Sequence, residues 1–265
     1  MTQASDALRW YRRLAGAMAL VVPVLGHAQS TARANEALKL IDQQQCEAAV
    51  DAINQGMRNN EPKSFYIAGQ LFQYGFCLVQ NVPRSLRLYE RGALLGDRDS
   101  ARTLALMHAR GDGVPQSYQQ AGRWYAVMRQ EKAGVAEPSV ESFAAPEVVV
   151  RTYIEAVTDL AATDLTYPRD AIDKGVFGTV KVRFDPRVAR IVLLGSTDST
   201  GSPTAPSPNR TDFERALLTS YADAIRVLPR PAMSPNIDHS IEHEVVFDRK
   251  IYVPNEPNGL QTLPR

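Results

Sequence analysis

The chain contains 265 residues, of which 44% are hydrophobic and 22% are charged. This balance is ordinary for a folded soluble protein with room for two modest cores, and it excludes an intrinsically disordered chain and a polytopic membrane protein. The 30 basic and 29 acidic residues nearly cancel, and loss of an N-terminal segment carrying Asp6, Arg9, Arg12 and Arg13 leaves 27 basic and 28 acidic residues. Without a basic excess, neither nucleic acid nor an anionic membrane surface is expected to be the main partner.

Residues 1–28 have the three-part order of a secretory signal peptide. Basic side chains end at Arg13, an apolar run covers residues 14–25, and the small residues Gly26 and Ala28 follow. This order predicts export and cleavage after Ala28. As a helix, the apolar run would cover about 18 Å, which is less than the roughly 30 Å hydrocarbon core of a bilayer. We therefore expect a periplasmic mature protein without a membrane span, with an uncleaved inner-membrane anchor as the alternative.

Two cysteines, Cys46 and Cys77, fit an exported protein, because an even number of cysteines in an oxidising compartment can form a bridge. The alternative is two separate buried thiols. Their spacing does not indicate a zinc site, which needs at least three ligands and would require histidines nearby.

The sequence between Glu61 and Glu131 repeats at a pitch of 36 residues. A period in this range predicts stacked helical hairpins, with glycines permitting the tight turn between the two helices of each hairpin. The aligned pairs are Gly75 with Gly111, Cys77 with Gly113, Leu78 with Val114, Ser85 with Ala121, Leu88 with Trp124, and Tyr89 with Tyr125.

These residues resemble the Sel-one-like repeats, short-turn relatives of the tetratricopeptide repeat. His108 stands where that family usually has an aromatic residue. The resemblance implies a helical repeat (solenoid) domain over residues 33–131 that binds other proteins and carries no chemistry, so the aligned residues are interpreted as packing positions. We expect residues 33–57 to form a further hairpin that caps the array and brings Cys46 close to Cys77.

A change in composition over residues 132–146 predicts a linker to a second domain over residues 147–252, followed by a loose tail over residues 253–265. Residues 147–160 favour a helix, although three consecutive valines also suit a strand. Alternating side chains then predict three strands, and a helix begins with Asp212 as its cap. The predicted strands cover residues 179–184, 190–194 and 241–251, and the helix covers residues 212–226.

The second domain resembles the C-terminal domain of TonB. The resemblance implies an α+β unit with a three-stranded antiparallel sheet and helices on one face. Two departures from the family are a missing turn glycine within residues 186–189 and a long proline-rich loop after Gly201. The matching residues are Tyr167, Pro168, Ala171, Gly175, Gly178, Val180, Val182 and Phe184.

The TonB resemblance implies that a peptide from an outer-membrane transporter adds as a strand to the edge of the sheet. We expect the last strand to provide that edge. The alternatives are a periplasmic interaction scaffold without energy transduction, an inner-membrane-anchored transducer, and a homodimer that closes the edge by strand exchange. The residues assigned to partner binding are Ile241, His243, Val245, Val246 and Phe247.

His239, Glu242 and His243 match the inverted zinc-peptidase motif, in which the histidines must lie one turn apart on a helix. Here Pro235 precedes the motif and a β-rich segment follows it, so the side chains are not expected to converge. No other catalytic or phosphate-binding pattern is present, and we expect a non-enzymatic protein without metal or cofactor.

We predict that the exported protein begins at residue 29, because the signal pattern places the cleavage site after Ala28. Intact-mass measurement of the purified mature protein tests this. A product that retains Arg9, Arg12 and Arg13 in the membrane fraction would favour the anchored alternative.

Overall fold

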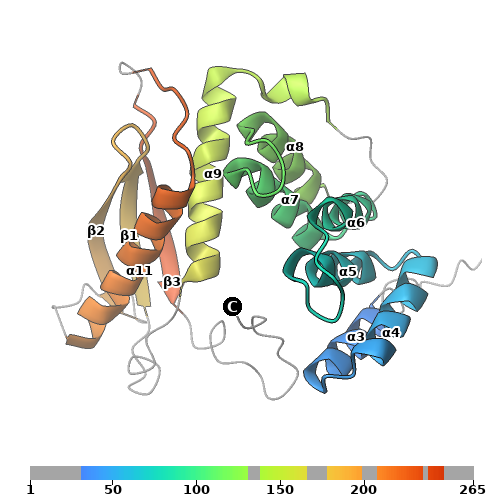
Figure 1. The fold of residues 1–265 in the computed structure, drawn as a ribbon. Coiled ribbons are helices and arrows are strands. Elements are labelled where there is room, and N and C mark those ends of the chain that lie inside the picture. Colours follow the sequence, from blue (N-terminus) through green and yellow to red (C-terminus); the bar gives the residue numbers. More distant parts are fainter. Residues whose placement is uncertain (1–30, 131–137, 166–177, 199–207, 235–237, 248–265) are drawn as a thin grey trace, which may run out of the picture.

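The computed structural model describes residues 31–130, 138–165, 178–198, 208–234 and 238–247. The predicted signal peptide, the tail, and Tyr167, Pro168, Ala171 and Gly175 of the TonB-like motif lie outside the described residues. The described chain combines a helical array with a small three-stranded antiparallel sheet, so the α+β prediction is confirmed (Figure 1). No helix in these ranges is long and apolar enough to cross a bilayer.

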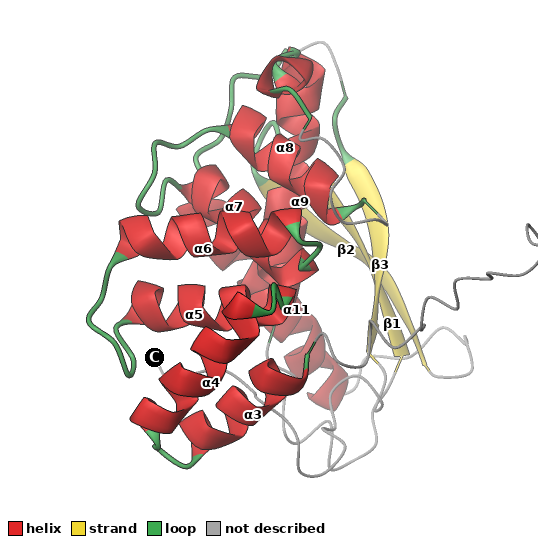
Figure 2. Cartoon of the chain, turned by 90° about the vertical axis from the view of Figure 1, so that its right-hand side faces the viewer, coloured by secondary structure: helices red, strands yellow, loops and turns green. Residues whose placement is uncertain are grey.

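Three helical hairpins stack in the array, and α5 lies between α4 and α6 (Figure 2). The second helices of the hairpins begin at Cys46, Val82 and Tyr118, at successive steps of the sequence pitch. The predicted N-terminal hairpin is therefore present and continues the repeat. The helices are α3 (Ala32–Asp42), α4 (Cys46–Arg58), α5 (Pro62–Tyr74), α6 (Val82–Leu94), α7 (Arg98–Arg110) and α8 (Tyr118–Met128).

Equivalent turns join the helices of the second and third hairpins. Gly75 and Gly111 end α5 and α7 with φ angles of 70° and 85°, in the left-handed region that glycine adopts without a steric penalty. Asn81 and Ser117 then cap α6 and α8, each accepting a hydrogen bond from a backbone N–H three residues later. Local sequence thus determines where each helix ends and the next begins.

The aligned aromatic positions form the interior of the array, as predicted. Tyr89, Trp124 and Tyr125 are at most 1% exposed. Leu88 is only partly buried, although it aligns with Trp124. The two hairpin interfaces are therefore not filled equally.

Helix α9 (Pro146–Asp164) joins the array to the sheet. The strand alternative for its valines is wrong, because these residues form the first turns of this helix. One side of α9 packs against α7 and α8, and another packs against α11 (Pro208–Val227). The short helix η1 (Val140–Phe143) lies within the segment predicted as a linker, where Phe143 packs against Gly122 of α8. One hydrophobic cluster runs from the array through α9 to the sheet.

The sheet has the strand order β2-β1-β3, with all neighbours antiparallel. Val180, Val182 and Phe184 of β1 are 0% exposed and face the helices, as their alternation predicted. The strands are β1 (Gly178–Asp185), β2 (Arg190–Asp198) and β3 (Ile241–Phe247).

Helices α9 and α11 and strand β2 extend beyond their predicted bounds. Helix α11 begins at Pro208 rather than at Asp212, and proline is well suited to a first turn because its missing N–H needs no partner there. Strand β2 continues past Leu194 to Asp198, since it stays paired with β1 over that length. Of the predicted third strand, residues 248–251 lie outside the described residues.

The turn between β1 and β2 lacks a glycine but retains a left-handed residue. Ala189 adopts a φ of 50°, a left-handed backbone angle at which residues with a Cβ atom are sterically disfavoured. Asp185 stabilises the turn by accepting hydrogen bonds from the backbone N–H and the guanidinium of Arg187. These bonds and the adjoining strand pairs hold the turn without a glycine.

Cys46 and Cys77 form the predicted disulfide, with their Cα atoms 5.1 Å apart. Cys77 has a φ of 59°, close to the 71° of the aligned Gly113. One repeat later, Val82 and Gly113 occupy the corresponding positions and lie in contact. The disulfide therefore takes the place of an inter-hairpin packing contact.

We predict that Cys46→Ala/Cys77→Ala lowers the free energy of unfolding by roughly 3–4 kcal/mol, because the bridge no longer restricts the unfolded chain. Cys46→Ala/Cys77→Gly should be about 0.5–1 kcal/mol more stable than the double alanine variant, since glycine accepts the left-handed backbone. Denaturant unfolding of the wild type and both variants measures the two differences. Equal stability of the two variants would contradict the role assigned to the backbone at residue 77.

Candidate functional site

Strand β3 lies at one edge of the sheet and pairs only with β1 among the described strands. Its seven residues keep an unbroken register, from Ile241 opposite Phe184 to Phe247 opposite Gly178. The other edge, β2, is interrupted by a register shift opposite Lys181 and Val182. Because bulges make an edge strand a poorer template for pairing, β3 is the more regular edge.

The predicted partner-binding residues divide between the two faces of β3. Ile241 and Val245 pack against the core cluster, whereas Val246 is 53% exposed on the opposite face. Phe247 ends the strand. The predicted alternation of the strand is confirmed. The assignment of these residues to partner binding stays a prediction.

Charged side chains cover the open face of the sheet beside Val246. The Glu242 carboxylate lies 3.2 Å from Lys181 Nζ and accepts a 2.9 Å hydrogen bond from Arg183 Nε. Hydrogen bonds from Arg183 and Lys181 lower the pKa of Glu242. This face therefore remains solvated, and next to it lies the edge of β3 that has no partner strand among the described residues.

His243 faces the interior and contacts Tyr221 of α11 through its Nε2 atom. Burial lowers the pKa of His243, and its Nδ1 atom has no hydrogen-bond partner within the described chain. Glu242 and His243 are consecutive strand residues and point to opposite faces, while His239 precedes the strand. The zinc-peptidase motif is thus not assembled, and the described ranges contain no cluster of three metal-ligand side chains.

Polar contacts that sequence reasoning missed connect the array to α9 and to the segment that follows α11. The Tyr118 hydroxyl donates to the Pro229 carbonyl oxygen at 2.6 Å. Arg102 forms an ion pair with Asp159, and the Tyr125 hydroxyl donates to the same carboxylate at 3.2 Å. These residues are far apart in sequence, and no fixed spacing indicates their pairing.

An apolar groove of about 240 Å³ lies between α4 and α6, with α5 as its floor. We call it the α4–α6 groove. Sequence reasoning did not identify it, although the aligned repeats contain its signal, which is smaller side chains at positions that are bulky in the next hairpin. Its lining residues are Val50, Ile53, Asn54, Met57, Ala68, Leu71, Phe72, Leu78, Arg84 and Leu88.

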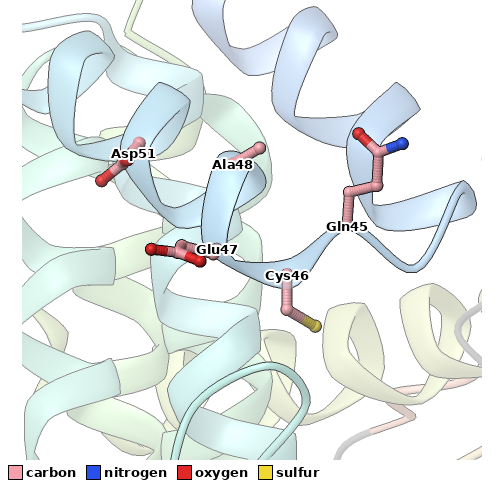
Figure 3. A pocket seen from close by; sticks show the side chains of 5 residues that line it. All are labelled: Gln45, Cys46, Glu47, Ala48 and Asp51. Carbon is pink, nitrogen blue, oxygen red and sulfur yellow. The ribbon is translucent and has the colours of Figure 1, made fainter.

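A second hollow, of about 440 Å³, lies at the start of α4 (Figure 3). Its walls come from one short stretch of chain, and the side chains of Gln45 and Glu47 point away from each other. It is open to solvent and does not gather the functional groups of separate elements. Its lining residues are Gln45, Cys46, Glu47, Ala48 and Asp51.

Comparison with known proteins gives a structural resemblance but no match in sequence. No family model matches the chain, and no curated protein matches it. The chain is similar to a solved Sel1 repeat protein from Oxalobacter formigenes, with 19% sequence identity and a TM-score of 0.35. The similarity covers 50% of this chain and 62% of that protein, so this chain spans less than two thirds of the relative's length.

We predict that the protein loses stability as the pH falls from about 7.5 to about 5, partly because His243 is protonated more readily in the unfolded chain than in the folded one. The sign follows from its lowered folded-state pKa, which makes the unfolded state bind more protons. His243→Phe should therefore show a smaller fall in melting temperature over this range. Burial also lowers the pKa of His108, so the melting temperature of His243→Phe should still depend on pH. Adding His108→Phe to that variant should reduce the dependence further. Parallel thermal unfolding curves give the slopes, and an unchanged slope in His243→Phe would refute the assignment.

Proposed function

We propose that the protein is a non-enzymatic interaction protein of the bacterial periplasm, and that it binds an extended peptide by strand addition at β3. The observation that carries this proposal is the edge position of β3, with seven residues in unbroken register. An added strand gains backbone hydrogen bonds along the edge, while side-chain alternation fixes its register. The flanking charges would restrict which peptides can pair.

Two features support an exported interaction protein. A disulfide between Cys46 and Cys77 is typical of oxidising compartments and rare in the cytosol. The stacked hairpins also provide a large surface of the kind that repeat proteins use to bind other proteins. One core cluster joins the later hairpins of this surface to the sheet, so one partner could contact both.

The resemblance to TonB favours an outer-membrane transporter or another envelope protein as the source of the peptide. Energy transduction would further require an anchor in the inner membrane, which the expected cleavage after Ala28 would remove. We therefore favour an adaptor or scaffold over a transducer. A second copy of the chain is the competing occupant of the edge, and it would give a strand-exchanged dimer.

Proline substitution tests the edge, because proline removes a backbone N–H donor. Successive residues of a strand direct this group to opposite sides, so either Val245→Pro or Val246→Pro removes a donor that faces the open edge. The variant that retains the wild-type circular dichroism spectrum is the one to assay. Val192→Pro on the opposite edge serves as the matched control.

Envelope extract is passed over the immobilised full chain, and retained proteins are identified by mass spectrometry. The β3 variant should lose the partners that the wild type retains, while Val192→Pro keeps them. Retention of the same partners by the folded β3 variant would overturn the proposal. Size-exclusion chromatography distinguishes the dimer, since strand exchange would give a wild-type dimer that the β3 variant converts to monomer.

A further inference from the structure

Three positions that line the α4–α6 groove carry smaller side chains than the equivalent positions one repeat later. Ile53, Ala68 and Leu88 line the groove, and a step of 36 residues brings these positions to Tyr89, Leu104 and Trp124. Those three larger residues are at most 1% exposed and close the corresponding space between α6 and α8. The groove is therefore a specific departure from the repeat's own packing.

One rim of the groove is positively charged. The Arg84 guanidinium lies 4.3 Å from the centre of the Phe72 ring, at the edge of the apolar floor. Arg87 and Arg91 follow on α6 at helical spacing, and all three arginines are exposed. Neither Arg84 nor Arg87 forms an ion pair with a carboxylate in the part of the chain that the structure describes.

The opposite rim does not neutralise these arginines. Its lining residues from α4 are Val50, Ile53, Asn54 and Met57, which carry no charge. The groove thus combines an apolar floor with positive charge along one side that no carboxylate of the described residues pairs with. At about 240 Å³, it is smaller than the roughly 300–1,000 Å³ of typical cofactor and drug-sized sites, and it suits one or two side chains of a peptide.

We propose that the α4–α6 groove binds an acidic peptide segment of a protein partner. One or two apolar side chains enter between Ile53 and Leu88, and carboxylates pair with Arg84 and Arg87. An arginine beside an aromatic ring can accept a carboxylate while its apolar stem stays packed. This inference rests on the proposed interaction function, but it assigns a second binding surface that is independent of β3.

The repeat supplies a test variant that should remain folded. Ala68→Leu/Leu88→Trp introduces into the groove the residues found at the same two positions one repeat later. Its melting temperature should equal or exceed that of the wild type, because it buries more apolar surface. Arg84→Gln/Arg87→Gln is a second variant that removes only the charge, and Arg190→Gln on β2 is the matched surface control.

Random peptides are displayed and selected on the full-length protein, and the enriched peptides are synthesised with a fluorescent label. Fluorescence anisotropy then gives their dissociation constants for each variant. We expect enriched peptides that combine aliphatic or aromatic residues with Asp or Glu. The groove-filling and charge-removing variants should each weaken binding by at least about tenfold, a difference of about 1.4 kcal/mol, while Arg190→Gln should leave it unchanged.

The folded β3 proline variant separates this inference from the proposed function. Peptides that bind this variant normally but not the groove-filling variant support the groove. Peptides that are lost only with the β3 variant support strand addition and overturn the groove, as does the absence of any enriched acidic and apolar sequence. If the groove-filling variant is unfolded, the test uses the charge-removing variant alone. Unchanged peptide binding by Arg84→Gln/Arg87→Gln then overturns the proposal.

Discussion

The stacking of the hairpins depends on a glycine of one helix that lies directly against a serine of the next. Gly56 faces Ser64 and Gly92 faces Ser100, and a Cβ atom at either glycine would overlap the serine side chain. The following equivalent position is Met128, whose side chain leaves no room for the same approach. Helix α9 instead approaches α8 at Gly122. The regular array therefore ends where the close contact is no longer possible.

Helix α9 can end the array because it is apolar on more than one side. It covers the last hairpin and also forms part of the layer over the sheet, so removing either neighbour would expose apolar surface. The ion pair with Arg102 and the hydrogen bond from Tyr125 also fix the orientation of α9 relative to the array. If the two proposed binding surfaces are both used, this connection holds them at a fixed separation and favours a partner that reaches both at once.

The first hairpin is held differently from the others. Its core is a separate cluster dominated by alanines with only a few larger side chains, including Ile53 and Leu71. A small apolar core gives limited stability, and disulfides commonly supplement such cores. The Cys46–Cys77 bridge supplies this support, which allows the neighbouring interface to remain incompletely filled. The disulfide and the α4–α6 groove thus lie at the same interface, between the first and second hairpins.

Most of the helical array follows from local sequence. The pitch of 36 residues, the left-handed Gly75 and Gly111, and the caps at Asn81 and Ser117 each depend on nearby residues, so the sequence predicts them. The two-residue alternation of β1 likewise predicts its buried face, because it depends only on strand geometry.

Other features depend on contacts between residues distant in the sequence. Helicity of the valine-rich start of α9 is decided by packing against α8 and α11, because β-branched residues suit both secondary structures. The edge position of β3 is set by strand order, which no local pattern encodes. The sequence by itself determined the repeat, the turns and the alternation of the strands, and it predicted the pairing of Cys46 with Cys77 that the structure then confirmed. Only the tertiary structure decided how α9 joins the array to the sheet and which hairpin interface stays open, because both depend on how side chains from separate helices fill a shared volume.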